Sequence, residues 1–276
     1  MEVWSNLLKF LDARMTCPTP FGWFHLLSWG LSILMAVLLC AFHKKGDQDR
    51  VRRTVMVISL IAFFFEILKQ LNFGFSSDTN YLVFDFQWYA FPYQFCSVPM
   101  YVGILQGIIK KGKVHDALCA FLATYAIFAG VCVMIYPNDV FVETTIINIQ
   151  TMVCHATMLP IGVYLIYTGH VKCEQRTILS AMCVFLTAMT GAVVLNESVY
   201  HSGVLGDETF NMFFVSQHFE CTLPVYSLVH GKIPYVLSLA VYFGGFSAAA
   251  YIILNIEILI KKLCERLSAP LRSEKA

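Results

Sequence analysis

Charged residues are scarce in this sequence, and their scarcity excludes most classes of soluble protein. Of the 276 residues, 13% are Asp, Glu, Lys or Arg and 58% are hydrophobic. Soluble globular domains carry about 25% charged and about 45–50% apolar residues. The mean hydropathy is +0.65, and a net charge of +1 gives no field to steer an acidic partner. The composition therefore excludes a disordered chain, a nucleic-acid binder and an ordinary soluble enzyme, and predicts an integral membrane protein.

Cysteine patterns typical of metal sites are also missing. The ten cysteines include no CxxC pair and no Cys/His spacing typical of zinc. Most are interpreted as small residues that pack between helices. Cys17 and Cys221 are both expected on the outer side, where a disulfide could form, but the sequence leaves that pairing open. We expect no metal and no soluble cofactor.

Seven apolar segments are long enough to cross a membrane. About 20 mostly apolar residues span a hydrocarbon core of about 30 Å. The chain is therefore expected to be an all-α, polytopic, single membrane domain with a seven-helix bundle over 22–259. The spans are predicted over 22–42, 54–75, 91–109, 114–136, 146–170, 177–200 and 233–259.

The segments outside the spans also have a predicted role. Within the first 21 residues, Trp4, Leu7, Leu8 and Leu11 recur at helical spacing, which predicts a short amphipathic helix on the outer interface. Residues 260–276 form a basic tail. The long, partly aromatic loop over 201–232 is expected to pack back on the bundle or to dip into the membrane.

Lysine and arginine are absent from two of the connecting loops, and this asymmetry predicts the orientation. Loops 76–90 and 137–145 have none, whereas 43–53, 110–113, 171–176 and the tail after 259 hold 15 of the 19. Basic residues accumulate on the cytoplasmic side of membrane proteins. The N-terminus is therefore expected in the lumen or outside, and the C-terminus in the cytosol.

Polar side chains inside the predicted spans gather in one leaflet. An ionisable residue at the bilayer centre costs about 2.5–3.5 kcal/mol on insertion scales, so each one needs a reason. With a rise of 1.5 Å per residue, four spans place such groups in the outer half. They are Glu66, Lys69, Gln70, Gln94, Cys96, Gln150, His155, Asn196 and Glu197. The sequence therefore predicts a polar cavity that opens toward the lumenal or outer leaflet.

Cys96 and His155 are predicted at similar depth in this cavity. A thiol beside an imidazole supplies a nucleophile and a base that can convert it to the thiolate. The amide of Gln94, two residues before Cys96, could stabilise an oxyanion. Cys154 is a weaker candidate, because its side chain points about 100° away from that of His155 around a helix.

Glu66 and Lys69 lie three residues apart and share one helical face. They could form an ion pair that lowers the cost of insertion. Alternatively, Lys69 could bind a lipid phosphate, or Glu66 could orient a histidine. The sequence leaves these readings open. Pro92, Pro99 and Pro160 are expected to distort the helices beside the site.

Two segments resemble a known family. The stretch FPYQFCSVPMYV (91–102) resembles the L-P-x-Q/H-x-C segment that opens a span in the YwaF / transmembrane protein 164 family. The stretch IYPNDVFVETTIINIQTMVCHATMLPIGVYLI (135–166) resembles that family's Pro-Asp loop and the following span with a membrane-embedded His. Glu66 fits a carboxylate in the second span. The resemblance covers roughly residues 55–200, and departs from the bacterial pattern at LNESVYHSG (195–203).

The resemblance implies an acyltransferase. Such an enzyme would move a fatty acyl chain from a donor phospholipid to a lyso- or ether-lysophospholipid through an acyl-cysteine, with Cys96 as nucleophile and His155 as base. The expected partners are membrane phospholipids and lysophospholipids, and the expected location is the endoplasmic reticulum with the site facing the lumenal leaflet. The expected substrate contacts are Lys69, Gln70, Gln150, Asn196 and Glu197.

Other functions stay open at this point. A seven-span receptor fits the topology, but span three ends in GIIKKGK rather than an acidic-Arg-Tyr triplet, and span seven contains ILNIEIL rather than Asn-Pro-x-x-Tyr. A retinal protein would need a lysine in the last span, and the predicted span over 233–259 contains none. A transporter or lipid scramblase would need polar residues in the inner leaflet, where they are sparse. A binding protein related to the enzymes, without catalysis, is a further alternative.

Overall fold

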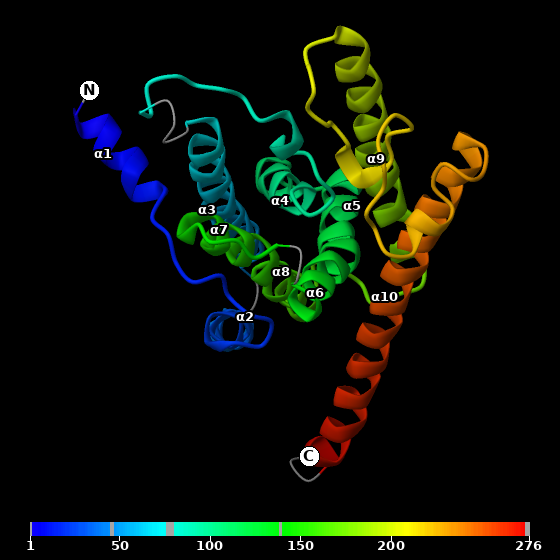
Figure 1. The fold of residues 1–276 in the computed structure, drawn as a ribbon. Coiled ribbons are helices and arrows are strands. Elements are labelled where there is room, and N and C mark those ends of the chain that lie inside the picture. Colours follow the sequence, from blue (N-terminus) through cyan, green and yellow to red (C-terminus); the bar gives the residue numbers. More distant parts are fainter. Residues whose placement is uncertain (1, 45–46, 76–79, 138–139, 274–276) are drawn as a thin grey trace.

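The apolar segments fold as helices, because only internal hydrogen bonds can satisfy the backbone where water is absent. The computed structural model describes residues 2–44, 47–75, 80–137 and 140–273, and every regular element in these ranges is helical (Figure 1). The α-helices are α1 (Glu2–Leu11), α2 (Trp23–Ala41), α3 (Gln48–Gly74), α4 (Val98–Ile108), α5 (Lys113–Phe121), α6 (Ile127–Ile135), α7 (Thr145–Ala156), α8 (Met158–Tyr167), α9 (Thr177–Ser202) and α10 (Tyr235–Ser273).

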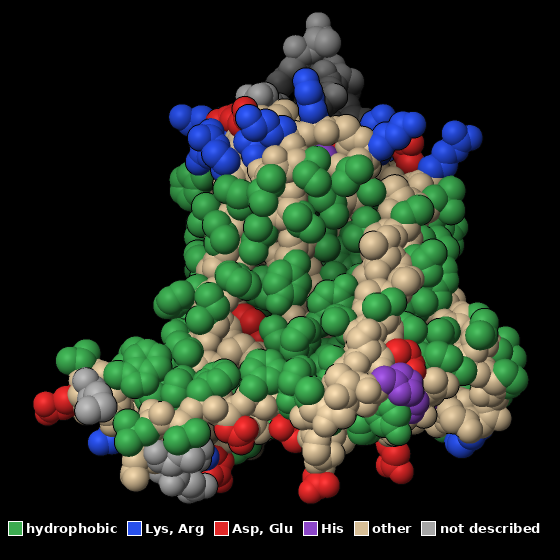
Figure 2. Space-filling model, turned by 90° about the horizontal axis from the view of Figure 1, so that it is seen from above, with side chains coloured by type: hydrophobic (Ala, Val, Ile, Leu, Met, Phe, Trp, Pro, Cys, Tyr) green, Lys and Arg blue, Asp and Glu red, His purple; other side chains and the backbone are tan. Residues whose placement is uncertain are grey.

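Within the described residues, six helical segments are long and apolar enough to cross a membrane. The pairs α5–α6 and α7–α8 each act as one such segment. The six are Trp23–Ala41, Gln48–Gly74, Lys113–Ile135, Thr145–Tyr167, Thr177–Ser202 and Tyr235–Leu263. On the face shown in Figure 2, hydrophobic side chains cover the middle of the molecule and Lys and Arg form a layer at one end. The prediction of an all-helical membrane protein is confirmed.

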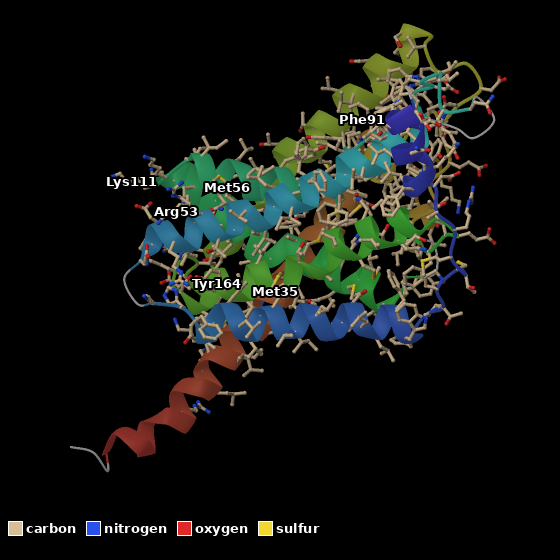
Figure 3. All side chains as sticks on the ribbon, turned by 90° about the vertical axis from the view of Figure 1, so that its left-hand side faces the viewer. Met35, Arg53, Met56, Phe91, Lys111 and Tyr164 are labelled. Carbon is tan, nitrogen blue, oxygen red and sulfur yellow. The ribbon has the colours of Figure 1, made fainter. Side chains whose placement is uncertain are left out.

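The third predicted span differs from expectation. Residues 91–109 were predicted as one helix, but α4 covers only the 11 residues Val98–Ile108, about 16 Å at 1.5 Å per residue. The stretch over 91–97 is not α-helical, so the prediction is wrong there. Pro99 is tolerated because it lies in the first turn of α4, where its missing N–H has no partner to lose. Figure 3 places Phe91 and Lys111 at opposite ends of the bundle.

The fifth span is interrupted as Pro160 predicts. Proline has no N–H to donate to the carbonyl four residues earlier, which here belongs to Ala156, the last residue of α7. Ser32 of α2 donates its hydroxyl to that carbonyl at 2.6 Å. A neighbouring helix thus satisfies the freed backbone group, as membrane helices with proline require.

A second irregularity lies between α5 and α6. Residues 122–126 form one π-helical turn, η3 (Leu122–Ala126), and all five are buried. Such turns widen a helix locally and are frequent beside functional sites. Leu122 and Ala126 line the same small cavity as Cys96 and Cys154, so both irregular spans border the candidate site.

The N-terminal helix is present as predicted. In α1, Leu8 and Leu11 are buried, and Trp4 packs edge-on against Phe75 with ring centroids 5.5 Å apart. Asn72 of α3 donates to the Leu11 carbonyl at 3.2 Å. The helix is therefore docked on the end of α3. Further along the chain, Cys17 and Cys221 are free thiols in this structure.

An aromatic core surrounds Phe185 of α9. Its ring is stacked on Tyr125 at 4.6 Å between centroids and on Phe246 of α10 at 5.7 Å, and Phe95 packs edge-on at 5.4 Å. Phe213, from the loop between α9 and α10, adds a further stacked ring at 6.2 Å. That loop packs back on the bundle, one of the two arrangements that the sequence predicted.

Candidate functional site

A buried carboxylate organises the C-terminal half of α3. Glu66 is 2% exposed and forms an ion pair with Lys69 at 2.7 Å. Gln70 donates to Glu66 Oε1 at 2.9 Å and Gln150 of α7 donates to Oε2 at 2.7 Å. The ion-pair reading of Glu66 and Lys69 is therefore confirmed, and these three donors compensate the burial of the charge.

The network extends from Glu66 to a thiol. The amide nitrogen of Gln150 also donates to Cys154 Sγ at 3.3 Å, and that of Gln70 reaches the Ala90 carbonyl at 2.7 Å. Four of the predicted polar residues are thus brought together by α3 and α7. The sequence reasoning did not place Cys154 in this hydrogen-bond network, because it compared the direction of the Cys154 side chain with that of His155 alone.

His155 is buried and is held by its own helix. Its Nδ1 lies 2.7 Å from the carbonyl of Thr151, which can only accept, so Nδ1 carries the proton. In the neutral ring, Nε2 then presents a lone pair. Nε2 is buried without a hydrogen-bond partner among the described residues. The alternative in which Glu66 orients a histidine is wrong here, because the Thr151 carbonyl orients His155 instead.

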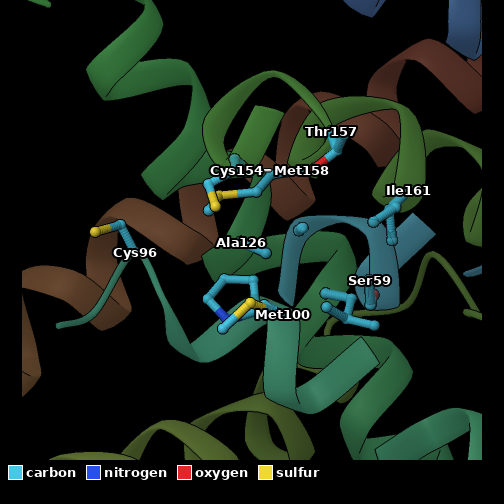
Figure 4. Close-up of a pocket in the computed structure, with 11 residues that line it drawn as sticks. Ser59, Cys96, Met100, Ala126, Cys154, Thr157, Met158 and Ile161 are labelled. Carbon is cyan, nitrogen blue, oxygen red and sulfur yellow. Dashed lines mark hydrogen bonds between the residues drawn. The ribbon is translucent and has the colours of Figure 1, made fainter. Parts of the chain in front are cut away.

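Cys96 lies on the irregular stretch before α4, and Cys154 on α7. Both line one cavity of about 10 Å³, together with Ser59, Pro99, Met100, Thr157, Met158 and others. This is space for about one water molecule, not for an acyl chain. In Figure 4 the Cys96 thiol is turned to the side away from Cys154. Within the described residues, no hydrogen bond joins Cys96 to His155, so the geometry leaves their pairing a prediction.

Gln94 has a different task from the oxyanion donor that was predicted. Its Nε2 donates to the Asn211 carbonyl and its Oε1 accepts from the Phe213 N–H, both at 2.9 Å. Asn196 binds the backbone of the residue between these two, Met212. Its side-chain amide donates to the Met212 carbonyl at 3.0 Å and accepts from the Met212 N–H at 2.8 Å. Both amides are committed to the loop between α9 and α10, which corrects the expected role of Gln94.

The predicted polar groups therefore form separate networks rather than one continuous polar cavity. The Glu66 network lies between α3 and α7. Gln94 and Asn196 hold the loop, and Glu197 contacts His201 and His218. The reason is that a side chain's depth along a helix does not specify its rotation about the axis. Substrate contacts for Lys69, Gln70, Gln150, Asn196 and Glu197 stay predictions.

The arrangement can nevertheless support proton transfer. An imidazole with a fixed tautomer and an unpaired Nε2 is what a general base requires. Cys96, the candidate nucleophile, lies on the non-helical stretch before α4. The sequence reasoning predicted that the loop over 201–232 packs on the bundle, but it missed the hydrogen bonds by which Gln94 and Asn196 hold residues 211–213.

The fold and these buried polar groups define a helical integral membrane protein with a thiol and an imidazole in its interior. The chain belongs to the TMEM164 family, whose model matches residues 20–256. This confirms the resemblance found in the sequence and extends it over most of the chain. Comparisons with curated proteins and with solved structures found no match.

Proposed function

We propose that this protein is a membrane acyltransferase that moves a fatty acyl chain from a donor phospholipid to a lyso- or ether-lysophospholipid. Cys96 is the nucleophile and His155 the general base. Membership of the TMEM164 family agrees with the resemblance from which this chemistry was inferred. The observation that carries the proposal is the buried, unpartnered Nε2 of His155, opposite an Nδ1 that is fixed on the Thr151 carbonyl.

The reaction proceeds in two balanced steps. His155 Nε2 takes the proton of the Cys96 thiol, the thiolate attacks the donor ester carbonyl, and the ester C–O bond breaks to leave a thioester. The departing lysolipid oxygen takes the proton from the imidazolium. The acceptor hydroxyl then gives its proton to Nε2 and attacks the thioester. The C–S bond breaks, and the imidazolium returns its proton to the departing sulfur, which restores Cys96 and His155.

Substrate binding requires the site to open. The cavity beside Cys96 has a volume of about 10 Å³, so an acyl chain must displace side chains that line it. Met100 and Met158 are the two methionines in this lining, and methionine adapts its shape more readily than branched residues. The two lipids approach from the bilayer itself, so no path through water is needed.

The proposal includes a topology of seven crossings with a lumenal N-terminus and a cytosolic C-terminus. The short α4 together with 91–97 connects the end near Phe91 to the end near Lys111 (Figure 3), which supports a seventh crossing. The basic layer at one end (Figure 2) supports a cytosolic assignment of that end. The endoplasmic reticulum is the proposed location. Accessibility of single cysteines placed at residues 87 and 111 to an impermeant reagent tests the topology.

The covalent intermediate is tested by mass spectrometry of the purified full chain with and without hydroxylamine. Wild type should carry a hydroxylamine-labile fatty acyl adduct on Cys96, which is lost in Cys96→Ala. His155→Ala should abolish its formation, because the thiol then lacks its base. Cys154→Ala is the matched control: it removes the second thiol of the same cavity and should retain the adduct.

Two results would count against the proposal. An adduct on Cys154 that survives Cys96→Ala would move the nucleophile to α7. No adduct on any thiol, together with unchanged lipid profiles in cells expressing Cys96→Ala, would remove the thiol mechanism. The second result would favour a transporter or a ligand-binding protein without catalysis.

A further inference from the structure

Three potential metal ligands converge at the end of α9, apart from the thiol and the imidazole of the proposed chemistry. Glu197 and His201 lie four residues apart and so share one face of the helix. His218 comes from the loop between α9 and α10. The ligand atoms of the three residues all lie within 4.8 Å of one another. Glu197 Oε2 is 3.1 Å from His218 Nε2 and 3.6 Å from His201 Nε2.

The neighbouring side chains orient this cluster. Gln217 donates to Glu197 Oε1 at 3.3 Å, which leaves Oε2 to face both imidazoles. The ring of Tyr200 stacks on His218 with centroids 3.6 Å apart and an interplanar angle of 4°, and the backbone N–H of His218 donates to Ser216 Oγ at 3.3 Å. Supporting contacts of this kind fix metal ligands before a metal arrives.

The spacing fits a tetrahedral ion. Zn²⁺ binds imidazole nitrogen and carboxylate oxygen at about 2.0–2.2 Å, so neighbouring donors in a tetrahedron are separated by about 3.3–3.6 Å. The separations between Glu197 Oε2 and the two imidazole nitrogens, 3.1 and 3.6 Å, lie close to this range. Two histidines and one carboxylate, with a fourth position left for water or another ligand, form a donor set that zinc uses in proteins.

We propose that Glu197, His201 and His218 form a Zn²⁺ site with one open coordination position. The metal would tie α9 to the loop between α9 and α10. That loop is already anchored at Met212 and Phe213 by Asn196 and Gln94, so the ion would complete a set of attachments around residues 211–218. This role is independent of the proposed acyl transfer. Without a metal, the same residues would form only imidazole–carboxylate contacts.

The test uses the purified full chain, stripped with a chelator and then titrated with Zn²⁺ in competition with a chromophoric chelator. Co²⁺ serves as a second probe, because a tetrahedral site gives it visible absorption bands. Wild type should bind one equivalent at this site, and Zn²⁺ should raise its Tm. His201→Ala and His218→Ala should each weaken that binding by at least about 10-fold and remove the Tm shift. Gln217→Ala should weaken it about 10-fold through the supporting contact.

Controls separate this site from other histidines and thiols and from misfolding. His43 lies at the opposite end of the bundle from the proposed site, so His43→Ala should bind Zn²⁺ as wild type does. Cys96→Ala should do the same. The side chain of His201 is 69% exposed, so its replacement should not disturb packing, and an unchanged circular dichroism spectrum and metal-free Tm would verify this. Unchanged Zn²⁺ affinity and Tm shift in both His201→Ala and His218→Ala would overturn the proposal, as would the absence of a one-equivalent site in wild type.

Discussion

Gln94 and Phe213 lie 119 residues apart in the chain and are joined by a hydrogen bond of 2.9 Å from the Phe213 N–H to Gln94 Oε1. Phe213 and Phe214 have φ angles of +59° and +58°, a region that residues other than glycine rarely adopt. Such a conformation costs on the order of 1–3 kcal/mol per residue and persists only when its surroundings enforce it. The Gln94 amide, together with Asn196, holds this strained turn against the bundle.

Replacing Gln94 should therefore loosen the loop. Gln94→Ala leaves the buried Phe213 N–H without its partner, a loss of about 1–3 kcal/mol, while the Asn211 carbonyl retains only the Phe214 N–H as a donor. We expect a lower Tm in detergent and faster hydrogen exchange over residues 210–218. Gln87→Ala is the control, because among the residues that the structure describes the Gln87 amide bonds to Asp85 alone. Equal exchange in the two variants would contradict the role assigned to Gln94.

Glu66 and Lys69 should be strongly coupled in stability. Glu66→Ala leaves the Lys69 ammonium in a span without its counter-ion, and removal of one partner of a buried pair costs about 3–5 kcal/mol. Lys69→Met should also destabilise the protein. The double variant should lose less than the two single losses added together, as measured by thermal unfolding of all four proteins. Additive losses would mean that the pair at 2.7 Å contributes no coupling.

The contact between α3 and α4 depends on the absence of a side chain at position 103. A Cβ added to Gly103 would overlap Ser59 Oγ and lie 2.9 Å from Ser59 Cβ. Small residues allow membrane helices to approach closely, so Gly103→Ala should lower the Tm. Gly30→Ala in α2 is the matched control, since nothing lies within 4 Å of its added Cβ. It should be neutral or stabilising by up to about 1 kcal/mol through helix propensity.

His170 should make stability depend on pH. It follows α8, outside the spanning helices, and burial lowers its pKa below the ordinary value of 6.5, with smaller contributions from His115 and His43. The unfolded chain then binds the proton more tightly than the folded one, so this contribution to stability is full above pH 6.5 and decreases as pH falls below it. Tm measured from pH 7.5 to 5 should fall less in His170→Gln than in wild type. His43→Gln is the control, because His43 lies at the same end of the bundle. If this variant reduced the fall in Tm as much as His170→Gln does, the assignment to His170 would be contradicted.

Composition and hydropathy were sufficient for the class of protein, because burial in a bilayer requires long apolar segments that are visible in any sequence. The same reasoning located α2, α9, Lys113–Ile135 and Thr145–Tyr167 to within a few residues. It was less accurate for α3, which begins six residues before the predicted span, and for α10, which continues as a helix to Ser273 through most of the predicted tail. It was wrong over 91–97, where the apolar run continues although the backbone is not α-helical. Hydropathy measures which residues avoid water, and an irregular stretch packed inside a bundle avoids water as well as a helix does.

The sequence by itself determined that Glu66, Lys69, Gln94, Cys96, His155 and Asn196 are polar groups in apolar segments, and that each needs a partner or a function. Only the tertiary structure decided which partner each one has. Glu66 meets Gln150 rather than His155, His155 is oriented by the Thr151 carbonyl, and Gln94 holds Phe213. The physical reason is that these choices depend on helix rotation, on the break beside Pro160 and on the return of a loop from 119 residues away, none of which leaves a periodic pattern in the chain.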